Sequence, residues 1–388
     1  MEIKNMKIRF NRHELAAAIA PLMSCVSTKV TVPAAEGILI EAKYPDECTL
    51  TTFDLEKGMR VKTRAQVIEE GTYIINAVKL SQTLRVMPAD EIELDVDTRN
   101  VASIVCGKSS HKMNALAGSD FPAIPSLDSD DAFTVKQNDL REMFSQTMYA
   151  MGVNDQRNIL NGTFVKMVND KITMVSCDNF KLAKCDRTID YSTDQHYEGT
   201  FRNAFILPVK TVNELVKLLS DNKEKTTRVF ITRKNIVFEI GEIIFFSRLI
   251  EGEYLDYDRI IVQNHKYSAE LDRNELISAL ERAALVTEEK IAGSLRSHVK
   301  LIFDGNLLKI TANSSAGSTY DEIEINDIGS PLTIGFNNRY LINSVKACNA
   351  DRIKLSLSSH LSSLNIVPAE AKEGIDEVFM LLPVRLKD

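Results

Sequence analysis

The feature that most constrains the fold is a pattern that occurs three times along the chain. A strand-like run, a polar break and an amphipathic helical run recur, and their first helical leucines are Leu15, Leu140 and Leu276. A second helical run follows each of them, 65, 75 and 65 positions later. Helices and strands that merely alternated would give scattered offsets. The spacing therefore predicts three copies of one structural unit.

Polar residues mark equivalent points in each copy. The residues expected to cap the first helices, by accepting hydrogen bonds from backbone N–H groups, are Asn11, Asn138 and Asn274. Polar turns then break the strand-like runs between the two helices, at Asp54, Asp178 and Asn313. These turns lie 39, 38 and 37 positions after the first leucine of their copy. The near-constant spacing of this third landmark strengthens the evidence for a repeat.

Each copy closes with further strand-like runs, such as EIELDVD, RVFITR and RIKLSLS. Their period-two alternation and β-branched residues are typical of strands. The order of strand, helix, strands, helix and strands predicts α+β domains whose helices cover one sheet face. Short polar stretches at 126–132 and 262–268 separate the copies. We expect three domains, at residues 1–126, 127–262 and 263–388.

The composition is that of a folded protein with no overall affinity for nucleic acid. The 388 residues are 44% hydrophobic, which excludes wholesale disorder, and the net charge is −7, so any basic surface must be local. No run approaches the roughly 18 apolar residues that span a bilayer. The first ten residues lack the apolar core of a secretory signal, and the six cysteines form no CxxC pair. We expect a cytoplasmic protein with reduced thiols and no membrane partner.

Motifs that would indicate catalysis are absent from the sequence. There is no phosphate-binding GxxxxGK or GxGxxG and no GxSxG nucleophile turn. His13 and Glu14 open like a zinc-protease motif, but no second His follows at the required spacing. A calcium-loop pattern at Asp95 has Cys106 where such loops need Glu. The sequence therefore favours a protein that works by shape, with no catalytic residue, metal or cofactor.

Basic residues lie off the apolar stripes of the helical runs. They are Lys79, Arg85, Arg141, Lys210, Lys217, Arg282, Arg339 and Lys346. If the repeats pack side by side, one face of the assembly is basic and attracts phosphates without reading sequence. The alternative is that these residues form ordinary solvated helix faces.

The chain resembles the bacterial DNA sliding clamps, the β subunits of DNA polymerase III, over virtually its whole length. The matching stretches, in order, are TTFDLEKGMRV, ALAGSDFPAIPSL, DQRNILNGTFV, VSCDNFKLAKCD, ILPVKTVNELVKLL, FFSRLIEGEYLDYDRII, ERAALVTEEKIAG, LKITANSSAG, IGFNNRYLI and FMLLPVRL. No single stretch is decisive, but their order across three repeats is very specific.

The resemblance implies three clamp domains per chain and a head-to-tail homodimer that closes a six-domain ring around double-stranded DNA, with helices inside and sheets outside. Such a ring is a non-catalytic processivity subunit of the DNA polymerase III holoenzyme, which slides on DNA and tethers its partners. The implied partners are the polymerase III α subunit, the clamp loader, other polymerases and mismatch-repair proteins, which bind through short linear motifs.

The resemblance also implies a groove for these motifs between the second and third domains. The residues at matching positions are Leu160, Cys177, Asn179, Phe180, Lys181, Leu182, Arg259, Ile260, Met380, Leu382, Pro383, Val384, Arg385 and Leu386. Where the family commonly has Gly-His-Arg-Leu, this chain has Asn179-Phe180-Lys181-Leu182. We expect Phe180 to enlarge the apolar wall and Lys181 to lose the planar fork of Arg.

Two further sets of residues follow from the resemblance. The residues expected to face DNA are Lys29, Asn154, Asn158, Ile159 and Lys210, and the ring interface would join His111 and Met113 to Leu285 and Val286. Tyrosines in the best-known pattern are replaced by Asn158 and Ile159, so stacking on single-stranded DNA is weakened. His111, where the family often has Phe, suggests a weaker or pH-sensitive interface.

Two other classes of function stay open at this point. An adaptor could bind peptides in the same groove without encircling DNA. An enzyme could carry a site that no known motif reveals, and purified protein would then show hydrolytic turnover.

Overall fold

The computed structural model describes residues 5–27, 32–125, 132–189, 192–193, 203–287, 290–291, 294–295, 298–315, 317–326 and 328–386. Internal contacts divide the chain into two compact units. Unit 1 comprises Met1–Val135, Ser192–Thr200 and Glu224–Leu249, and unit 2 comprises Lys136–Tyr191, Phe201–Lys223 and Ile250–Asp388. These units cut through the second copy of the repeat, and the domain boundaries expected at 126 and 262 stay a prediction.

The first repeat contains β1 (Met6–Asn11), α1 (Arg12–Leu22), β2 (Gly37–Lys43), β3 (Glu47–Phe53), β4 (Lys57–Arg64), β5 (Gln66–Glu69), β6 (Gly71–Asn76), α2 (Ala77–Val86), β7 (Glu91–Val96), β8 (Val101–Cys106) and β9 (Ser109–Ala117). The second contains β10 (Ala132–Lys136), α3 (Gln137–Thr147), β11 (Gly162–Val168), β12 (Lys171–Cys177), β13 (Lys181–Thr188), β14 (Ser192–Thr193), β15 (Ala204–Pro208), α4 (Val209–Leu218), β16 (Thr226–Ile231), β17 (Asn235–Ile240) and β18 (Ile243–Arg248).

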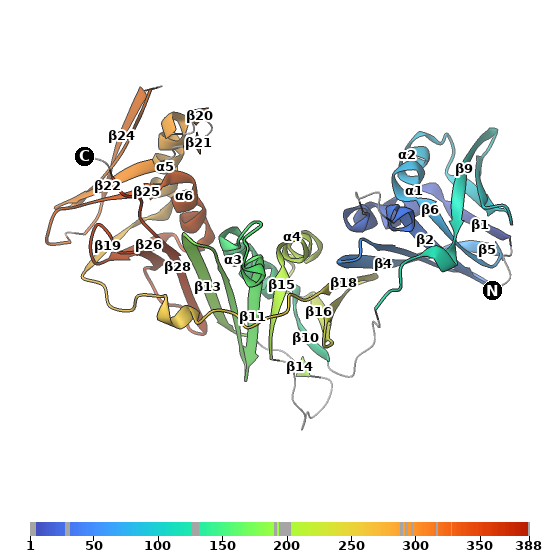
Figure 1. Ribbon diagram of the computed structural model, residues 1–388, viewed down its shortest axis with the longest axis horizontal. Coiled ribbons are helices and arrows are strands. Elements are labelled where there is room, and N and C mark those ends of the chain that lie inside the picture. The colour runs from blue at the N-terminus through green and yellow to red at the C-terminus, as the bar shows by residue number, and fades with distance from the viewer. Residues whose placement is uncertain are drawn as a thin grey trace. The chain divides into compact units, whose positions relative to one another are not determined.

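The third repeat contains β19 (Tyr267–Asp272), α5 (Arg273–Thr287), β20 (Lys290–Ile291), β21 (Ser294–Leu295), β22 (His298–Asp304), β23 (Leu307–Ser314), β24 (Gly317–Glu324), β25 (Leu332–Asn337), α6 (Asn338–Ala347), β26 (Arg352–Leu357), β27 (Leu364–Pro368) and β28 (Ile375–Leu381). Each repeat therefore has a strand, a helix, a group of strands, a second helix and three closing strands (Figure 1). The predicted threefold α+β repeat is confirmed.

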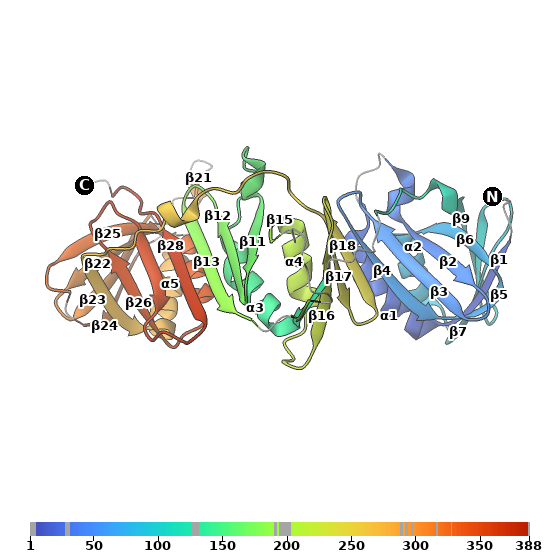
Figure 2. The same ribbon diagram turned by 90° about the horizontal axis from the view of Figure 1, so that it is seen from below.

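Neighbouring repeats are joined by strand pairing that uses equivalent strands. In unit 1, the last strand of the second repeat, β18, pairs antiparallel with β4, the fourth strand of the first repeat. In unit 2, the last strand of the third repeat, β28, pairs antiparallel with β13, the fourth strand of the second repeat (Figure 2). The eight-stranded sheet of unit 2 therefore runs in the order β15-β11-β12-β13-β28-β27-β26-β19. Both junctions follow one joining rule: the last strand of a repeat pairs with the fourth strand of the repeat before it.

The two helices of each repeat are linked by an equivalent contact. Arg12 at the start of α1 donates to the carbonyl of Leu84 in the last turn of α2 and to that of Ala89 just after this helix. In the second repeat, Arg141 donates to Val216 of α4, and in the third, Arg273 donates to Val345 and Lys346 of α6. The last carbonyls of a helix lack partners within the helix and carry partial negative charge, so each guanidinium caps its second helix.

The leucines that defined the repeat lie in the cores. Leu15, Leu80, Leu140, Leu215, Leu276 and Leu341 are all nearly inaccessible to solvent. Burial of each such side chain contributes about 1.5–3 kcal/mol, so these helices are held mainly by their apolar stripes. All six cysteine side chains are also buried as free thiols. Within the described residues, no helix is long and apolar enough to cross a membrane.

The predicted helix caps are correct in one repeat of three. Asn11 accepts hydrogen bonds from the backbone N–H groups of His13 and Glu14 and caps α1. Asn138 and Asn274 lie inside the first turns of α3 and α5, so these two predictions were wrong. In the third repeat Asp272 caps instead, since its carboxylate accepts from the N–H of Glu275. The nearest small polar residue was therefore not always the one that begins the helix.

Candidate partner-binding groove

Four of the predicted groove residues form the floor of one apolar cluster in unit 2. Leu160, Cys177, Leu182 and Met380 are each at least 96% buried and belong to the same cluster. Cys177 at the end of β12 faces Leu182 of β13 across the sheet, and Leu182 faces Met380 of β28. The β13–β28 pairing therefore brings residues of the second and third repeats side by side.

Aromatic side chains lie beside this floor, and the sequence did not single them out. Phe164 of β11 stacks on Tyr254 with ring centroids 5.0 Å apart, and Tyr257 lies 6.0 Å from Phe164. The hydroxyl of Tyr254 is 3.9 Å from the Cys177 sulfur, and burial raises the pKa of both groups. Both groups are therefore neutral at pH 7, which keeps the floor apolar. The two tyrosines at positions 254 and 257 were the sequence feature that could have predicted these aromatic contacts.

Three predicted residues expose apolar surface beside the floor. Phe180, Ile260 and Leu382 are 53%, 43% and 41% exposed. The N–H of Leu382 donates to the carbonyl of Phe180 at 2.8 Å, which ties the segment after β28 to the β12–β13 turn. Exposed large apolar side chains next to a buried apolar cluster are typical of protein-binding surfaces.

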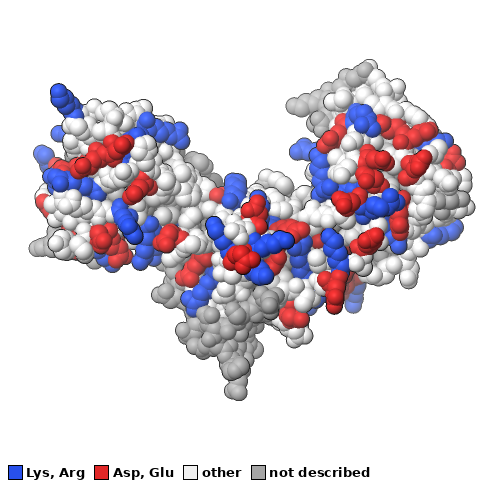
Figure 3. Space-filling model, turned by 180° about the vertical axis from the view of Figure 1, so that it is seen from behind, with Lys and Arg blue, Asp and Glu red and all other residues white. Residues whose placement is uncertain are grey.

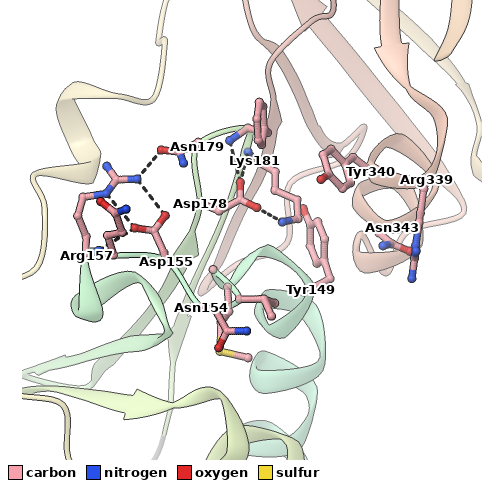
Figure 4. Close-up of a pocket in the computed structure, with 15 residues that line it drawn as sticks. Tyr149, Asn154, Asp155, Arg157, Asp178, Asn179, Lys181, Arg339, Tyr340 and Asn343 are labelled. Carbon is pink, nitrogen blue, oxygen red and sulfur yellow. Dashed lines mark hydrogen bonds and ion pairs between the residues drawn. The ribbon is translucent and has the colours of Figure 1, made fainter. Parts of the chain in front are cut away.

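A polar pocket of about 780 Å³ opens on the other side of this turn (Figure 4). The predicted residues Asn179, Phe180 and Lys181 line it, and so does Asn154, which was expected to face DNA. Its opposite wall is formed by Tyr340 and neighbouring residues of α6. Tyr340 lies far away in the sequence and was not predicted.

Charged side chains in the pocket form ion pairs with one another. Arg157 pairs with Asp155 at 3.2 Å and also donates to the side-chain oxygen of Asn179. The hydrogen bond from Arg157 lowers the pKa of Asp155. Lys181 pairs with Asp178, and its ammonium lies 5.0 Å from the centre of the Tyr340 ring, within cation–π range. The polar side of the groove is therefore preorganised.

The remaining groove residues lie at its edges. Arg259 is exposed and pairs with Asp256 at 2.8 Å. Beyond β28, the N–H of Val384 donates to the carbonyl of Gly335 in β25 at 2.8 Å. Pro383 and Leu386 are partly buried, while Arg385 is exposed. We call Leu382–Leu386 the tail segment.

The residues expected to face DNA lie at separate places. Lys29 lies outside the described residues. Asn158 is exposed in the short 3-10 turn Asn158–Leu160, and Ile159 packs partly buried against the groove floor. Lys210 is exposed in the first turn of α4. The structure thus brings Asn154, Asn158 and Ile159 into one loop beside the groove.

The residues expected at the ring interface lie in different units. In unit 1, His111 is exposed on β9, and Met113 is 8% exposed. They border a shallow depression with Lys79 and Val86 of α2, and Val86 is 80% exposed. In unit 2, Leu285 in the last turn of α5 is 84% exposed, and Val286 is partly buried.

The basic helix residues do not form an uninterrupted positive surface. Lys217 pairs with Glu214 at 3.4 Å, and Lys346 pairs with Glu281 at 2.6 Å. Arg282 pairs with Asp321 of β24. On the face shown in Figure 3, Lys and Arg are interspersed with Asp and Glu over both units. On this face the positive charge is therefore interrupted by carboxylates.

Three family models match consecutive parts of the chain. They describe the N-terminal domain of the DNA polymerase III beta subunit at residues 6–125, its central domain at residues 134–256, and its C-terminal domain at residues 258–383.

Individual relatives match over their full length. The beta sliding clamp of Chlamydia muridarum is 28% identical over 385 residues, covering 99% of this chain and 100% of the relative. The beta sliding clamp of Escherichia coli is 28% identical over 384 residues, covering 98% and 100%. The crystal structure of the DNA polymerase sliding clamp from Bacillus subtilis superposes with a TM-score of 0.90 at 24% identity, covering 99% and 100%. The chain belongs to the DNA polymerase III β-subunit family of sliding clamps.

Proposed function

We propose that two copies of this chain close a ring around double-stranded DNA and tether partner proteins through the groove described above. The chain acts as a sliding clamp, a non-catalytic processivity subunit in DNA replication. Two features of the structure support this proposal: the strand edges support the ring, and the groove supports the binding of partners.

The joining rule between repeats is the observation that carries the ring. Each junction pairs the last strand of one repeat with the fourth strand of the repeat before it. Applying the rule at both ends leaves β9, the last strand of the first repeat, and β24, which corresponds to β4 and β13 because the sheet of the third repeat runs in the order β25-β22-β23-β24. Within the described residues, β24 pairs only with β23, and residues 109–114 of β9 pair only with β8. Each copy therefore offers two different strand edges that fit each other.

A contact between two different edges is heterologous, so it closes a ring when the rotation permits and otherwise grows a filament. The exposed side chains next to these edges support the same contact. His111 and Met113 lie on β9 itself, and α5, which carries Leu285 and Val286, packs against β24. A pairing of β9 with β24 would cover the apolar surface of Leu285 and Val86.

The groove supplies the tether. Its apolar floor and exposed rim suit Leu and Phe anchors of a short linear motif, and its polar pocket suits a hydrogen-bonding residue next to them. The polymerase III α subunit, the clamp loader, other polymerases and mismatch-repair proteins are the partners that we propose to compete for it. Lys29, Asn154, Asn158, Ile159 and Lys210 are proposed to approach DNA.

The ring is tested by retention on circular DNA. The protein should form a dimer in light scattering, remain on a nicked circle after loading, and leave when the circle is cut. Leu285→Glu should abolish dimers and retention while leaving the fold unchanged in circular dichroism. Leu361→Glu is the matched control, because Leu361 is 63% exposed but lies between β26 and β27. A wild-type monomer at micromolar concentration that still binds motif peptides would identify an adaptor instead.

A further inference from the structure

A second pocket, of about 400 Å³, lies on the outer face of the four-stranded sheet of the third repeat. Strand β22 alternates, so Val299 and Leu301 enter the core while His298 and Lys300 point to the opposite face. Arg385 of the tail segment lines the same pocket. Three basic side chains therefore share one concave surface.

The tail segment forms this pocket by docking on a glycine. Lys300 of β22 faces Gly335 of β25 across the sheet. A Cβ atom at Gly335 would come within 2.5 Å of Leu386 Cδ2 and 3.2 Å of Val384 Cγ2. The missing side chain thus leaves room for the tail segment to lie on the sheet beside Lys300. The pocket exists because the tail is held there.

The basic groups of this pocket have no acidic partner in the part of the chain that the structure describes. Among the described residues, none of His298, Lys300 and Arg385 takes part in an ion pair, and no Asp or Glu lines the cavity. Lys309, which belongs to the neighbouring strand β23 of the same sheet, pairs with Asp304 at 2.7 Å. The charged groups of Lys300 and Arg385 share a concave surface that no carboxylate lines, and such a surface attracts an anion.

We infer that this pocket binds acidic side chains that flank the apolar motif of a partner seated in the groove. This inference rests on the proposed tethering function. Leu382 borders the groove and Leu386 borders the pocket, so the two sites are at most about 14 Å apart along the tail segment. Carboxylates within about four or five residues of the motif reach it.

The position of the pocket favours a peptide over DNA. Arg385 belongs to the tail segment that also borders the groove. His298 and Lys300 lie on the sheet face opposite the core on which α5 and α6 pack, and the proposed ring places helices toward DNA.

The test compares two synthetic peptides with the same Leu and Phe motif. One carries Asp and Glu on both flanks, and the other carries Asn and Gln at the same positions. Fluorescence anisotropy with the full-length protein should show about three- to tenfold tighter binding of the acidic peptide at low salt. The difference should shrink as salt is added, because surface charges are screened.

Variants assign the effect to the pocket. Lys300→Gln, alone and with His298→Gln, should remove most of the difference while leaving the affinity of the neutral peptide unchanged. Lys309→Gln, on the same sheet, should leave the difference intact. A difference that persists in the Lys300 and His298 variants would overturn the inference.

The remaining outcomes separate the two proposals. Equal binding of both peptides by the wild-type protein overturns the acidic-flank inference alone. No binding of either peptide overturns the groove, and with it this inference. Reduced retention on circular DNA in Lys300→Gln with unchanged peptide affinities would assign the pocket to phosphates and overturn the inference as stated.

Discussion

Two turns of the molecule have the same construction and serve different ends. Asp54 closes the β3–β4 turn by accepting from the N–H groups of Glu56 and Lys57, at 3.0 and 2.8 Å. Asp178 closes the β12–β13 turn by accepting from Phe180 and Lys181, at 2.7 and 2.9 Å. In each turn the Lys pairs with the Asp three residues before it. In the third repeat, Asn313 at the corresponding position lies in β23 and pairs with Ser318 of β24.

The surroundings of the two lysines differ. Lys57 donates to the carbonyl of Ser24 and lies 3.5 Å from the Cys25 sulfur, so its turn is sealed against the chain just after α1. Lys181 instead lies over the ring of Tyr340 at the wall of an open pocket. The shared hydrogen bonds form the turn in both places. The two central residues are then free to vary, and in the second repeat they include the exposed Phe180.

The largest effect is expected from removing the two aspartates. Asp54→Ala and Asp178→Ala each remove the acceptor for two N–H groups and the carboxylate partner of a lysine that is only 6% or 7% exposed. Each should lower the free energy of unfolding by about 2–4 kcal/mol, measured by urea denaturation. Only Asp178→Ala should also weaken motif-peptide binding. Equal loss of peptide binding in both variants would contradict the division of roles.

Phe180→Ala should weaken peptide binding by about tenfold, because the ring offers apolar surface to an anchor residue. The free energy of unfolding should change by less than about 0.5 kcal/mol, since the ring is 53% exposed. Calorimetric titration with a motif peptide measures the first effect. Glu56→Ala, at the equivalent position of the first turn, is the control and should change neither quantity.

Leu55 offers a smaller test in the first turn. Its φ of 77° lies in the left-handed region, which disfavours a branched side chain. Leu55→Asn introduces a short polar side chain that tolerates this region, as Asn100, Asn154 and Asn169 do elsewhere in the chain, and should stabilise the protein by about 0.5–1 kcal/mol. A thermal melt would register an increase of a few degrees at most. Destabilisation would mean that the 59% buried part of Leu55 matters more than its backbone.

The smallest effect concerns the thiols beside the two turns. Burial raises the pKa of Cys25 and Cys177 above the ordinary 9.0. These thiols therefore lose their protons more readily in the unfolded protein than in the folded protein. The stability that the neutral thiols contribute is fully present below pH 9 and declines above it. Both should alkylate at least tenfold more slowly at pH 8.5 than a free thiol, measured by mass spectrometry. A bound motif peptide should slow Cys177 further and leave Cys25 unchanged.

The sequence predicted the secondary structure of each repeat better than the contacts between repeats. Helical periodicity and leucine spacing located all six long helices, because these signals are local. The caps at Asn138 and Asn274 were wrong because several polar residues compete at a helix start, and Asp272 supplies the better geometry.

The groove was harder to predict from local patterns. Its residues came from the resemblance to a family, and the structure then gathered Leu160, Cys177, Leu182 and Met380 into one cluster. Tyr254 and Tyr340 were missed because periodicity tells which side chains are buried, not which distant strands and helices meet. The β13–β28 pairing that creates the groove joins strands separated by almost half of the sequence.

That pairing has a consequence for biosynthesis. Strand β13 leaves the ribosome about 190 residues before β28, so at roughly 5–20 residues per second its edge waits about 10–40 s for its neighbour. An unpaired edge rich in buried positions can recruit other nascent chains during that interval. Lys184 and Arg187, which lie on β13, place positive charge on this waiting strand. Slow translation of the third repeat should therefore lower the yield of native protein more than slow translation of the first.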